Sequence, residues 1–359
     1  MLGLLRTTLA LMVVTFHLLI ELSPLGTYSV FGFYLISGYL MTLIMHDNYG
    51  YTGSGRLAFA ANRLLRLYPS YWLAALGSAA LIIGIGPATV LRYHDSLFLP
   101  QSLKDYLSNA SMLFPAWLPN SVDPRLVPPA WALTVELFFY VAIGLGISKH
   151  PRRIKVWLLL SVAYVIGTYL LEAPLRQRYA PIAAGSLPFA VGSALYFLAK
   201  EPRVYQLYVR SRLRARHLFM ALLANCLLWT VLTVTHPGLY LEIGFYLNIG
   251  ICALLVYSLA KGDKIATIPA AADKVIGDFA YPVYLWHWQA GLAVSYLLYG
   301  EAFHELSGRG AIVFLTTLLV VAVLSLMTIY LVDIPIQRLR TKIRAMNRPA
   351  GRDMPRRLR

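Results

Sequence analysis

An arginine and a histidine lie eleven residues apart in the first apolar stretch of the chain, as Arg6 and His17 of LLRTTLALMVVTFHLLI. On an α-helix eleven residues complete three turns plus about 20°, so both side chains share one face, about 16 Å apart along the axis. Ionisable groups in membrane spans usually face a protein interior or a water-filled cavity. The pair therefore indicates a polar site in the membrane, although a snorkelling Arg6 and a core His17 would explain each residue alone.

A carboxylate occurs in a later apolar stretch, PPAWALTVELFFY, where Glu136 lies about 10 Å from the outer end of the expected helix. If this helix runs antiparallel to the first, Glu136 and His17 lie at similar depth. A carboxylate beside a histidine orients the ring and stabilises its protonated form. We therefore predict that His17 and Glu136 form a catalytic pair, with a structural ion pair or a neutral Glu136 between helices as the alternatives.

Two more arginines, Arg63 and Arg66 of ANRLLRLYPSYW, lie three residues apart on one helical face at the inner boundary of another stretch. Together with Arg6 they supply three guanidinium groups suited to phosphate recognition, whereas alone they would serve as interfacial anchors. The chain contains no GxxxxGK[ST] loop and no HExxH motif. A Walker-type nucleotide site and a zinc hydrolase site are therefore not indicated, and no metal is expected.

Four weaker candidates for substrate binding are Ser37, Tyr281, His287 and Trp131. Ser37 precedes Gly38 in FGFYLISGYL, where small residues near mid-membrane permit close helix packing. Tyr281 and His287 belong to FAYPVYLWHWQ, an aromatic cluster expected near mid-membrane rather than at an interface. We expect His287 to line a cavity, with a satisfied core histidine as an equal alternative.

The composition indicates which elements position these residues. Of 359 residues 58% are hydrophobic and 13% charged, and the mean hydropathy is +0.61, which is typical of a multi-pass membrane protein. We therefore predict an all-α transmembrane bundle with ten spans, at about 3–22, 25–46, 68–86, 129–147, 154–171, 180–199, 217–235, 239–260, 276–299 and 310–332. Cys226 and Cys252 both lie in apolar runs and indicate neither a disulfide framework nor a zinc site.

Basic residues predict the orientation of these spans. With the N-terminus inside, only six of the 32 Lys and Arg fall in outer connections: Arg92, Lys104, Arg125, Arg176, Arg178 and Arg309. This positive-inside bias places both termini in the cytoplasm. We expect a transmembrane domain over 1–335, a functional cap formed by its outer segment 87–128, and a basic cytoplasmic tail over 336–359. The net charge of +16 indicates contact with anionic lipid headgroups rather than with nucleic acid.

Taken together, the chain resembles the acyltransferase family 3 membrane proteins over nearly its whole length. The resemblance rests on Arg6 and His17 at the family's spacing, FGFYLISGYL (31–40), Arg63-Leu-Leu-Arg66 before Tyr68-Pro69, WALTVELFFY (131–140), YPVYLWHW (281–288) and Asp333-Ile-Pro335 before the basic tail. Two positions depart from the family pattern: Phe31 stands where an acidic residue often precedes FF, and Leu137 replaces the second Glu of VEEQF. Each departure leaves fewer polar contacts for an acceptor.

The resemblance implies a bacterial inner-membrane O-acyltransferase without an appended esterase-like domain. The acyl donor would be a cytoplasmic acyl-coenzyme A, with acetyl expected, and the acceptor a hydroxyl of a cell-surface or lipid-linked glycan. His17 would be the catalytic base, Glu136 an essential carboxylate, and Arg63 with Arg66 the residues that engage the coenzyme A phosphates. Direct transfer and an acyl-His17 intermediate are both compatible with the sequence, and Ser37, Tyr281 or a backbone amide are candidate oxyanion stabilisers.

Two other functions fit a polar site in a membrane bundle. A glycan or lipid transporter would show inverted repeats with paired interrupted helices, and the sequence has no such symmetry. A scaffold or sensor would not require a histidine and a carboxylate at depth. The sequence therefore favours the acyltransferase, and it leaves the oligomeric state open.

Overall fold

The computed structural model describes residues 2–19, 23–233, 235–236 and 238–346, which form helices and no strand. The α-helices are α1 (Gly3–Leu18), α2 (Ser23–Ile44), α3 (Gly53–Ile85), α4 (Pro87–Tyr93), α5 (Leu103–Ser111), α6 (Ala130–Leu145), α7 (Pro151–Leu170), α8 (Ile182–Leu198), α9 (Pro202–Ser211), α10 (Ala215–Leu232), α11 (Ile243–Ala260), α12 (Ala270–Tyr299), α13 (Gly308–Thr328) and α14 (Ile334–Met346). Short 3₁₀ segments are η2 (Pro119–Ser121), η3 (Leu175–Arg178) and η4 (Leu239–Leu241), and π-helical segments are η1 (Met45–Tyr49) and η5 (Ile329–Asp333). The all-α prediction is confirmed.

Each predicted span falls on one of these helices, although the helices differ in length and polarity. Among the described residues, seven helices are long and apolar enough to cross a membrane. Two more, α1 and α6, are apolar but shorter, and α12 has thirty residues with acidic residues in its first turns. The chain is therefore a multi-pass helical bundle, while a total of ten spans and cytoplasmic termini stay predictions.

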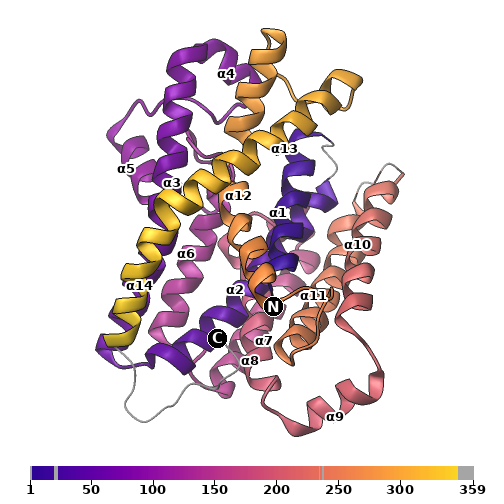
Figure 1. Cartoon of the computed structure of the whole chain (residues 1–359). Coiled ribbons are helices and arrows are strands. Elements are labelled where there is room, and N and C mark those ends of the chain that lie inside the picture. Colours follow the sequence, from indigo (N-terminus) through magenta and orange to yellow (C-terminus); the bar gives the residue numbers. More distant parts are fainter. Residues whose placement is uncertain (1, 20–22, 234, 237, 347–359) are drawn as a thin grey trace.

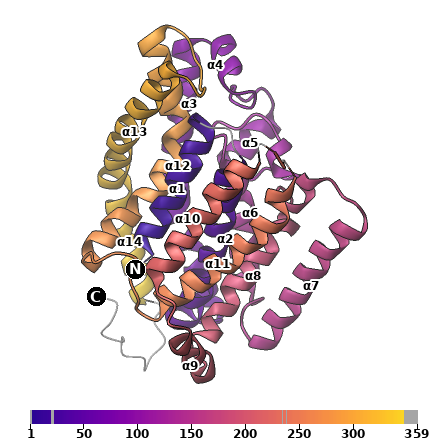
Figure 2. The same ribbon diagram turned by 90° about the vertical axis from the view of Figure 1, so that its right-hand side faces the viewer.

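Helices α1 and α12 run parallel through the centre of the bundle, side by side in both views (Figures 1 and 2). The carboxylate of Asp273 accepts hydrogen bonds from the backbone N–H groups of Gly3 and Leu4, each at 3.0 Å. These N–H groups have no partner within α1, so Asp273 caps this helix from the first turn of α12. One turn further along, the Thr7 hydroxyl donates to the carbonyl of Ile276 at 2.6 Å.

Helices α2 and α8 approach each other closely at two glycines. A Cβ atom added to Gly38 would lie 2.3 Å from the carbonyl oxygen of Phe189, and one added to Gly192 would lie 2.0 Å from that of Leu35. The Ser193 hydroxyl then reaches across to the Gly38 carbonyl at 3.2 Å. The predicted close packing at Gly38 is confirmed, and it holds the neighbouring Ser37 at a fixed position on α2.

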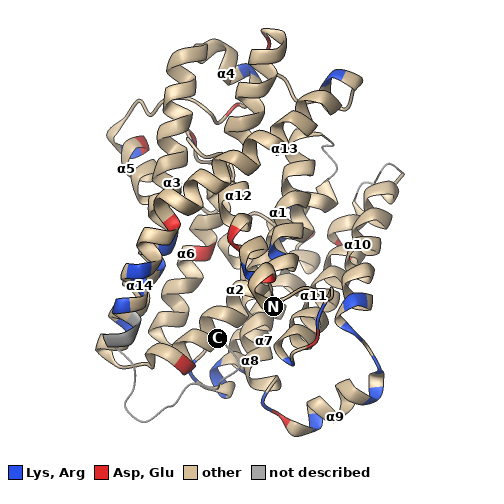
Figure 3. Ribbon diagram, viewed as in Figure 1, with Lys and Arg blue, Asp and Glu red and all other residues tan. Residues whose placement is uncertain are grey.

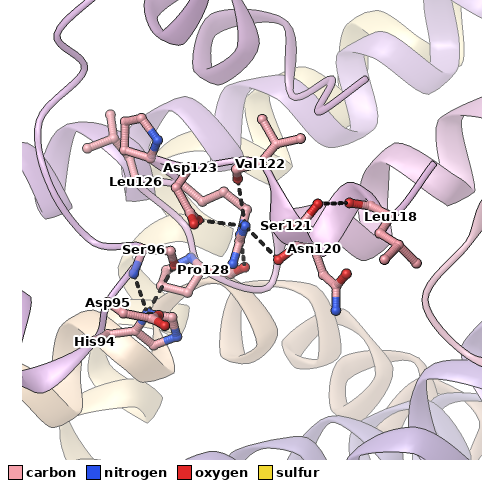
Figure 4. A network of polar contacts seen from close by, with 12 residues as sticks. His94, Asp95, Ser96, Leu118, Asn120, Ser121, Val122, Asp123, Leu126 and Pro128 are labelled. Atoms are coloured by element: carbon pink, nitrogen blue, oxygen red, sulfur yellow. Dashed lines mark hydrogen bonds and ion pairs between the residues drawn. The ribbon is translucent and has the colours of Figure 1, made fainter. Parts of the chain in front are cut away.

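One arginine, Arg125, holds together the last part of the segment 87–128. The guanidinium of Arg125 donates to the carbonyl oxygens of Pro128, Val122 and Asn120 at 3.0, 2.6 and 3.1 Å and to the Asp123 carboxylate at 2.8 Å, as the converging contacts in Figure 4 show. Because Nε and Nη1 of one side chain satisfy three loop carbonyls, this part of the chain holds its shape without a sheet. The segment 87–128 contains α4 and α5 rather than irregular chain alone.

Helix α14 packs against α3 and carries several basic residues toward one end of the bundle, where α9 also presents arginines (Figure 3). Arg340 and Asn62 join the two helices reciprocally: the amide of Asn62 donates to the Arg340 carbonyl at 3.0 Å, and Nε of Arg340 donates to Oδ1 of Asn62 at 2.8 Å. The predicted tail thus begins as a helix docked on the bundle. Its remainder, 347–359, lies outside the described residues.

Candidate active site

A cavity of about 150 Å³ lies between five helices and brings together six of the residues selected from the sequence. These residues are Arg6 of α1, Ser37 of α2, Arg63 and Arg66 of α3, Glu136 of α6 and Tyr281 of α12. Drug-sized ligands usually occupy pockets of roughly 300–1,000 Å³. The cavity would therefore admit a slender group rather than a whole nucleotide.

Two of the three arginines have no carboxylate partner among the described residues. Nη1 of Arg63 contacts the Met41 sulfur at 3.6 Å, and its guanidinium lies 5.9 Å from the ring centre of Phe59. The Nε atoms of Arg63 and of Arg6 are buried and donate to no described acceptor. Buried guanidinium donors without acceptors are costly to leave unpaired. These two side chains are therefore suited to bind an anionic ligand.

Arg66 differs because it already has a counter-ion. Nη1 of Arg66 lies 3.4 Å from Oδ2 of Asp333 in η5, and the other carboxylate oxygen of Asp333 accepts from Ser70 at 2.9 Å. The Arg66 guanidinium also lies 5.6 Å from the ring centre of Tyr281, whose hydroxyl donates to the Leu67 carbonyl at 2.9 Å. Asp333 thus holds Arg66 at the cavity wall in the absence of a ligand.

Glu136 faces the arginines rather than His17. Its Oε1 accepts hydrogen bonds from the Ser37 hydroxyl at 2.5 Å and from the Tyr140 hydroxyl. Helix α6 packs against α2 and α3, so a side chain on this face of α6 reaches α2 and not α1. The predicted pairing of His17 with Glu136 is therefore wrong.

His17 instead pairs with His287. Nδ1 of His17 lies 2.8 Å from Nε2 of His287, and the two rings stack with their centres 5.1 Å apart. Nδ1 of His287 lies 2.9 Å from the carbonyl oxygen of Tyr284, one turn earlier on α12. His287 is fully buried, whereas His17 is partly exposed.

The contact between His17 and His287 is compatible with the predicted topology. In the predicted topology spans one and nine both run from inside to outside, so His17 and His287 lie at similar levels of two parallel helices. Depth along the membrane normal does not say which helices are neighbours. For that reason depth alone predicted Glu136 as the partner of His17.

Trp288 of α12 packs beside the histidine pair, and two loop histidines, His94 and His304, contact its ring. The Trp288 ring lies 5.1 Å from the ring of His17, and on its other side it meets the rings of His94 at 4.4 Å and His304 at 5.2 Å. His94 also contacts the backbone N–H of Ser96 at 3.2 Å, within the network of Figure 4. Burial lowers the pKa of His94 to about 4. These ring contacts fix the position of Trp288 beside the histidine pair.

Tyr284 connects the two sites, because its side chain lines the cavity while its carbonyl binds His287. Along α12, Tyr281 and His287 are separated by about 9 Å. Trp131, the remaining predicted substrate-binding residue, does not line the cavity and packs on Tyr179 with the ring centres 5.4 Å apart. No group of three or more His, Cys, Asp or Glu among the described residues could hold a metal ion.

The chain is similar in sequence to known acyltransferases. A family model described as an acyltransferase domain matches residues 2–334. The exopolysaccharide production protein ExoZ of Rhizobium meliloti is 29% identical over 76% of this chain and 80% of its own length. The acyltransferase MdmB of Streptomyces mycarofaciens is 24% identical over 75% of this chain and 69% of its own.

A third relative is longer than the region it shares. The putative peptidoglycan O-acetyltransferase YrhL of Bacillus subtilis is 24% identical over 79% of this chain, which corresponds to 47% of that protein. No solved structure matches the chain.

Proposed function

Because this chain belongs to acyltransferase family 3, a family of membrane acyltransferases, we propose that it transfers an acetyl group from acetyl-coenzyme A to a glycan hydroxyl. The donor would enter from the cytoplasmic side of a bacterial inner membrane, and the acceptor would be a cell-surface or lipid-linked saccharide. The names of the relatives support this acceptor class, since one acts in exopolysaccharide production and another is a putative peptidoglycan O-acetyltransferase.

The observation that carries the proposal is the arrangement along α1 and α12. An arginine-lined cavity lies beside these parallel helices, and the histidine pair lies further along both of them. Arg6 and His17 are about 16 Å apart on the same helix. This spacing suits a donor whose charged end and reactive end are joined by a slender arm.

In the proposed reaction, Arg63, Arg66 and Arg6 bind the donor phosphates, and the acyl end of the donor extends past Tyr281 toward His17. Fork-shaped guanidinium groups bind phosphate oxygens through two parallel hydrogen bonds. Ser37 and Glu136 line the intervening wall, where the carboxylate fixes the serine hydroxyl. We assign Glu136 this structural and electrostatic role instead of contact with the catalytic base.

His17 then removes the proton of the acceptor hydroxyl while the oxygen attacks the thioester carbonyl. The tetrahedral intermediate breaks its carbon–sulfur bond, and the coenzyme A thiolate leaves and takes up a proton. A route through acyl-His17 gives the same products in two steps. Ser37 and Tyr281 already donate their hydroxyl hydrogens to Glu136 and to a backbone carbonyl, which favours another donor as the oxyanion stabiliser.

Transfer of radiolabelled acetyl from acetyl-coenzyme A to membrane glycan tests this function. We expect His17→Ala to abolish transfer while it leaves coenzyme A binding intact. His217→Ala is the matched control, because His217 is exposed on the first turn of α10. Transfer at the wild-type rate by His17→Ala, at equal protein abundance, would overturn the proposed chemistry.

A further inference from the structure

The histidine pair contains a chain of three hydrogen-bonding groups with a fixed direction. It begins at the backbone carbonyl of Tyr284, which lies 2.9 Å from Nδ1 of His287. A carbonyl oxygen has no hydrogen to donate, so Nδ1 of His287 must carry the proton and donate it. This contact lies within one helix turn and does not depend on a mobile side chain.

The first contact determines the second. A neutral imidazole has one N–H and one bare nitrogen, so His287 with its proton on Nδ1 presents a lone pair at Nε2. Nδ1 of His17 lies 2.8 Å from this lone pair and must therefore donate. The proton of neutral His17 is then on Nδ1, and Nε2 of His17 carries the bare lone pair.

That free nitrogen is the one placed to meet a substrate. No hydrogen bond among the described residues involves Nε2 of His17, and the side chain is partly exposed. The Trp288 ring lies 5.1 Å from the His17 ring and restricts its rotation. An isolated histidine in water prefers the opposite tautomer, with the proton on Nε2, in which this nitrogen could not act as a base.

We propose that His287 is a positioning residue that, together with the Tyr284 carbonyl, holds His17 in the tautomer whose Nε2 is the general base. This role rests on the proposed function, because it assigns a catalytic use to His17. It takes the place that a carboxylate occupies in many catalytic triads, where the third group fixes the tautomer and orientation of the base. Here a neutral ring and a backbone carbonyl serve instead, and no carboxylate of the described residues contacts either ring.

The tautomer can be measured without any reaction. The ¹⁵N chemical shifts of an imidazole distinguish a protonated from a bare nitrogen, and the signals of His17 are assigned by their loss in His17→Gln. In ¹⁵N-histidine-labelled protein at neutral pH we expect Nδ1 of His17 protonated and Nε2 bare. His287→Phe keeps an aromatic ring but offers no acceptor, so we expect the proton of His17 to move to Nε2.

Kinetics then test the positioning role. A general base contributes about 10²–10⁴-fold to a rate, so His287→Phe should lower kcat by roughly 100-fold or more with little change in KM for acetyl-coenzyme A. His287→Gln retains an acceptor oxygen, so it should recover part of the rate. Unchanged coenzyme A binding shows that each variant is folded, and His217→Ala again serves as the control.

The two possible failures are distinguishable. If wild-type His17 carries its proton on Nε2, or if His287→Phe leaves the tautomer unchanged, the positioning role is wrong whatever the activity. If the tautomer is as expected but His17→Ala transfers acetyl normally, the proposed function is wrong and the catalytic use of the tautomer fails with it.

Discussion

Arg63 and Arg66 should contribute unequally to donor binding, although they lie one helix turn apart on the same wall. Arg66 already has the Asp333 carboxylate at 3.4 Å, whereas no described carboxylate pairs with Arg63 and its Nε is buried without an acceptor. A phosphate therefore satisfies unpaired donors at Arg63 but must compete with Asp333 at Arg66. Arg63→Ala is thus expected to weaken donor binding more than Arg66→Ala.

The magnitude follows from the type of contact. A hydrogen bond to a charged group contributes about 1.5–3 kcal/mol, and 1.4 kcal/mol corresponds to a tenfold change in affinity. Arg63→Ala should therefore raise the Kd of coenzyme A by about 10- to 150-fold. At Arg66, the contact with a phosphate partly replaces the existing ion pair with Asp333. Arg66→Ala should therefore raise the Kd of coenzyme A by less than about tenfold.

Calorimetric titration of coenzyme A into detergent-purified protein, at one fixed ionic strength, measures both values. Arg63→Lys retains the charge but loses the planar guanidinium group, so its Kd should lie between those of the wild type and Arg63→Ala. Arg309→Ala serves as the control, because Arg309 lies in the first turn of α13 and pairs with Glu301 of the preceding connection at 3.6 Å. A Kd for Arg63→Ala within about twofold of wild type, or a larger loss for Arg66→Ala, would refute this reasoning.

Three further expectations follow from the structure. Asp333→Asn releases Arg66 from its counter-ion, so it should lower the Kd of coenzyme A a few-fold in the same titration. A higher Kd would contradict this and show that Asp333 supports binding. Gly38→Ala forces a Cβ against the α8 backbone and should cost about 1–3 kcal/mol, seen as a lower Tm, whereas Gly250→Ala meets no atom within 4 Å and should not lower it. His94 has its pKa lowered by burial to about 4 in the folded chain, below the usual value near 6.5, so the unfolded chain binds more protons between these values. Stability should therefore fall by up to about 3 kcal/mol as the pH drops from 6.5 to 4, and His94→Gln should flatten this part of the Tm profile.

The sequence predicted the helices and the arginine cluster because both depend on local pattern. Apolar runs of span length determine which segments are helical, and two arginines three residues apart share a face on any helix. Counting residues from the membrane boundary then places Arg6 beside Arg63 and Arg66, and all three line the cavity.

The sequence could not determine which helices are neighbours. Glu136 and His17 were expected at similar depth, but depth fixes only one coordinate of a side chain. The contacts of Glu136 depend on α6 packing against α2 and α3, and the contact of His17 depends on α12 packing against α1. Both arise from side-chain packing between helices that are distant in the chain.

The pairing of α1 with α12 has a consequence for how the protein is made. His17 and His287 are separated by 270 residues, as are Gly3 and Asp273, and synthesis at about 5–20 residues per second separates them by roughly 15–50 s. During that interval the first helix waits in the membrane with its histidine unpaired and its first N–H groups uncapped. The histidine pair is therefore assembled only after most of the chain has been synthesised, so incomplete chains do not contain it.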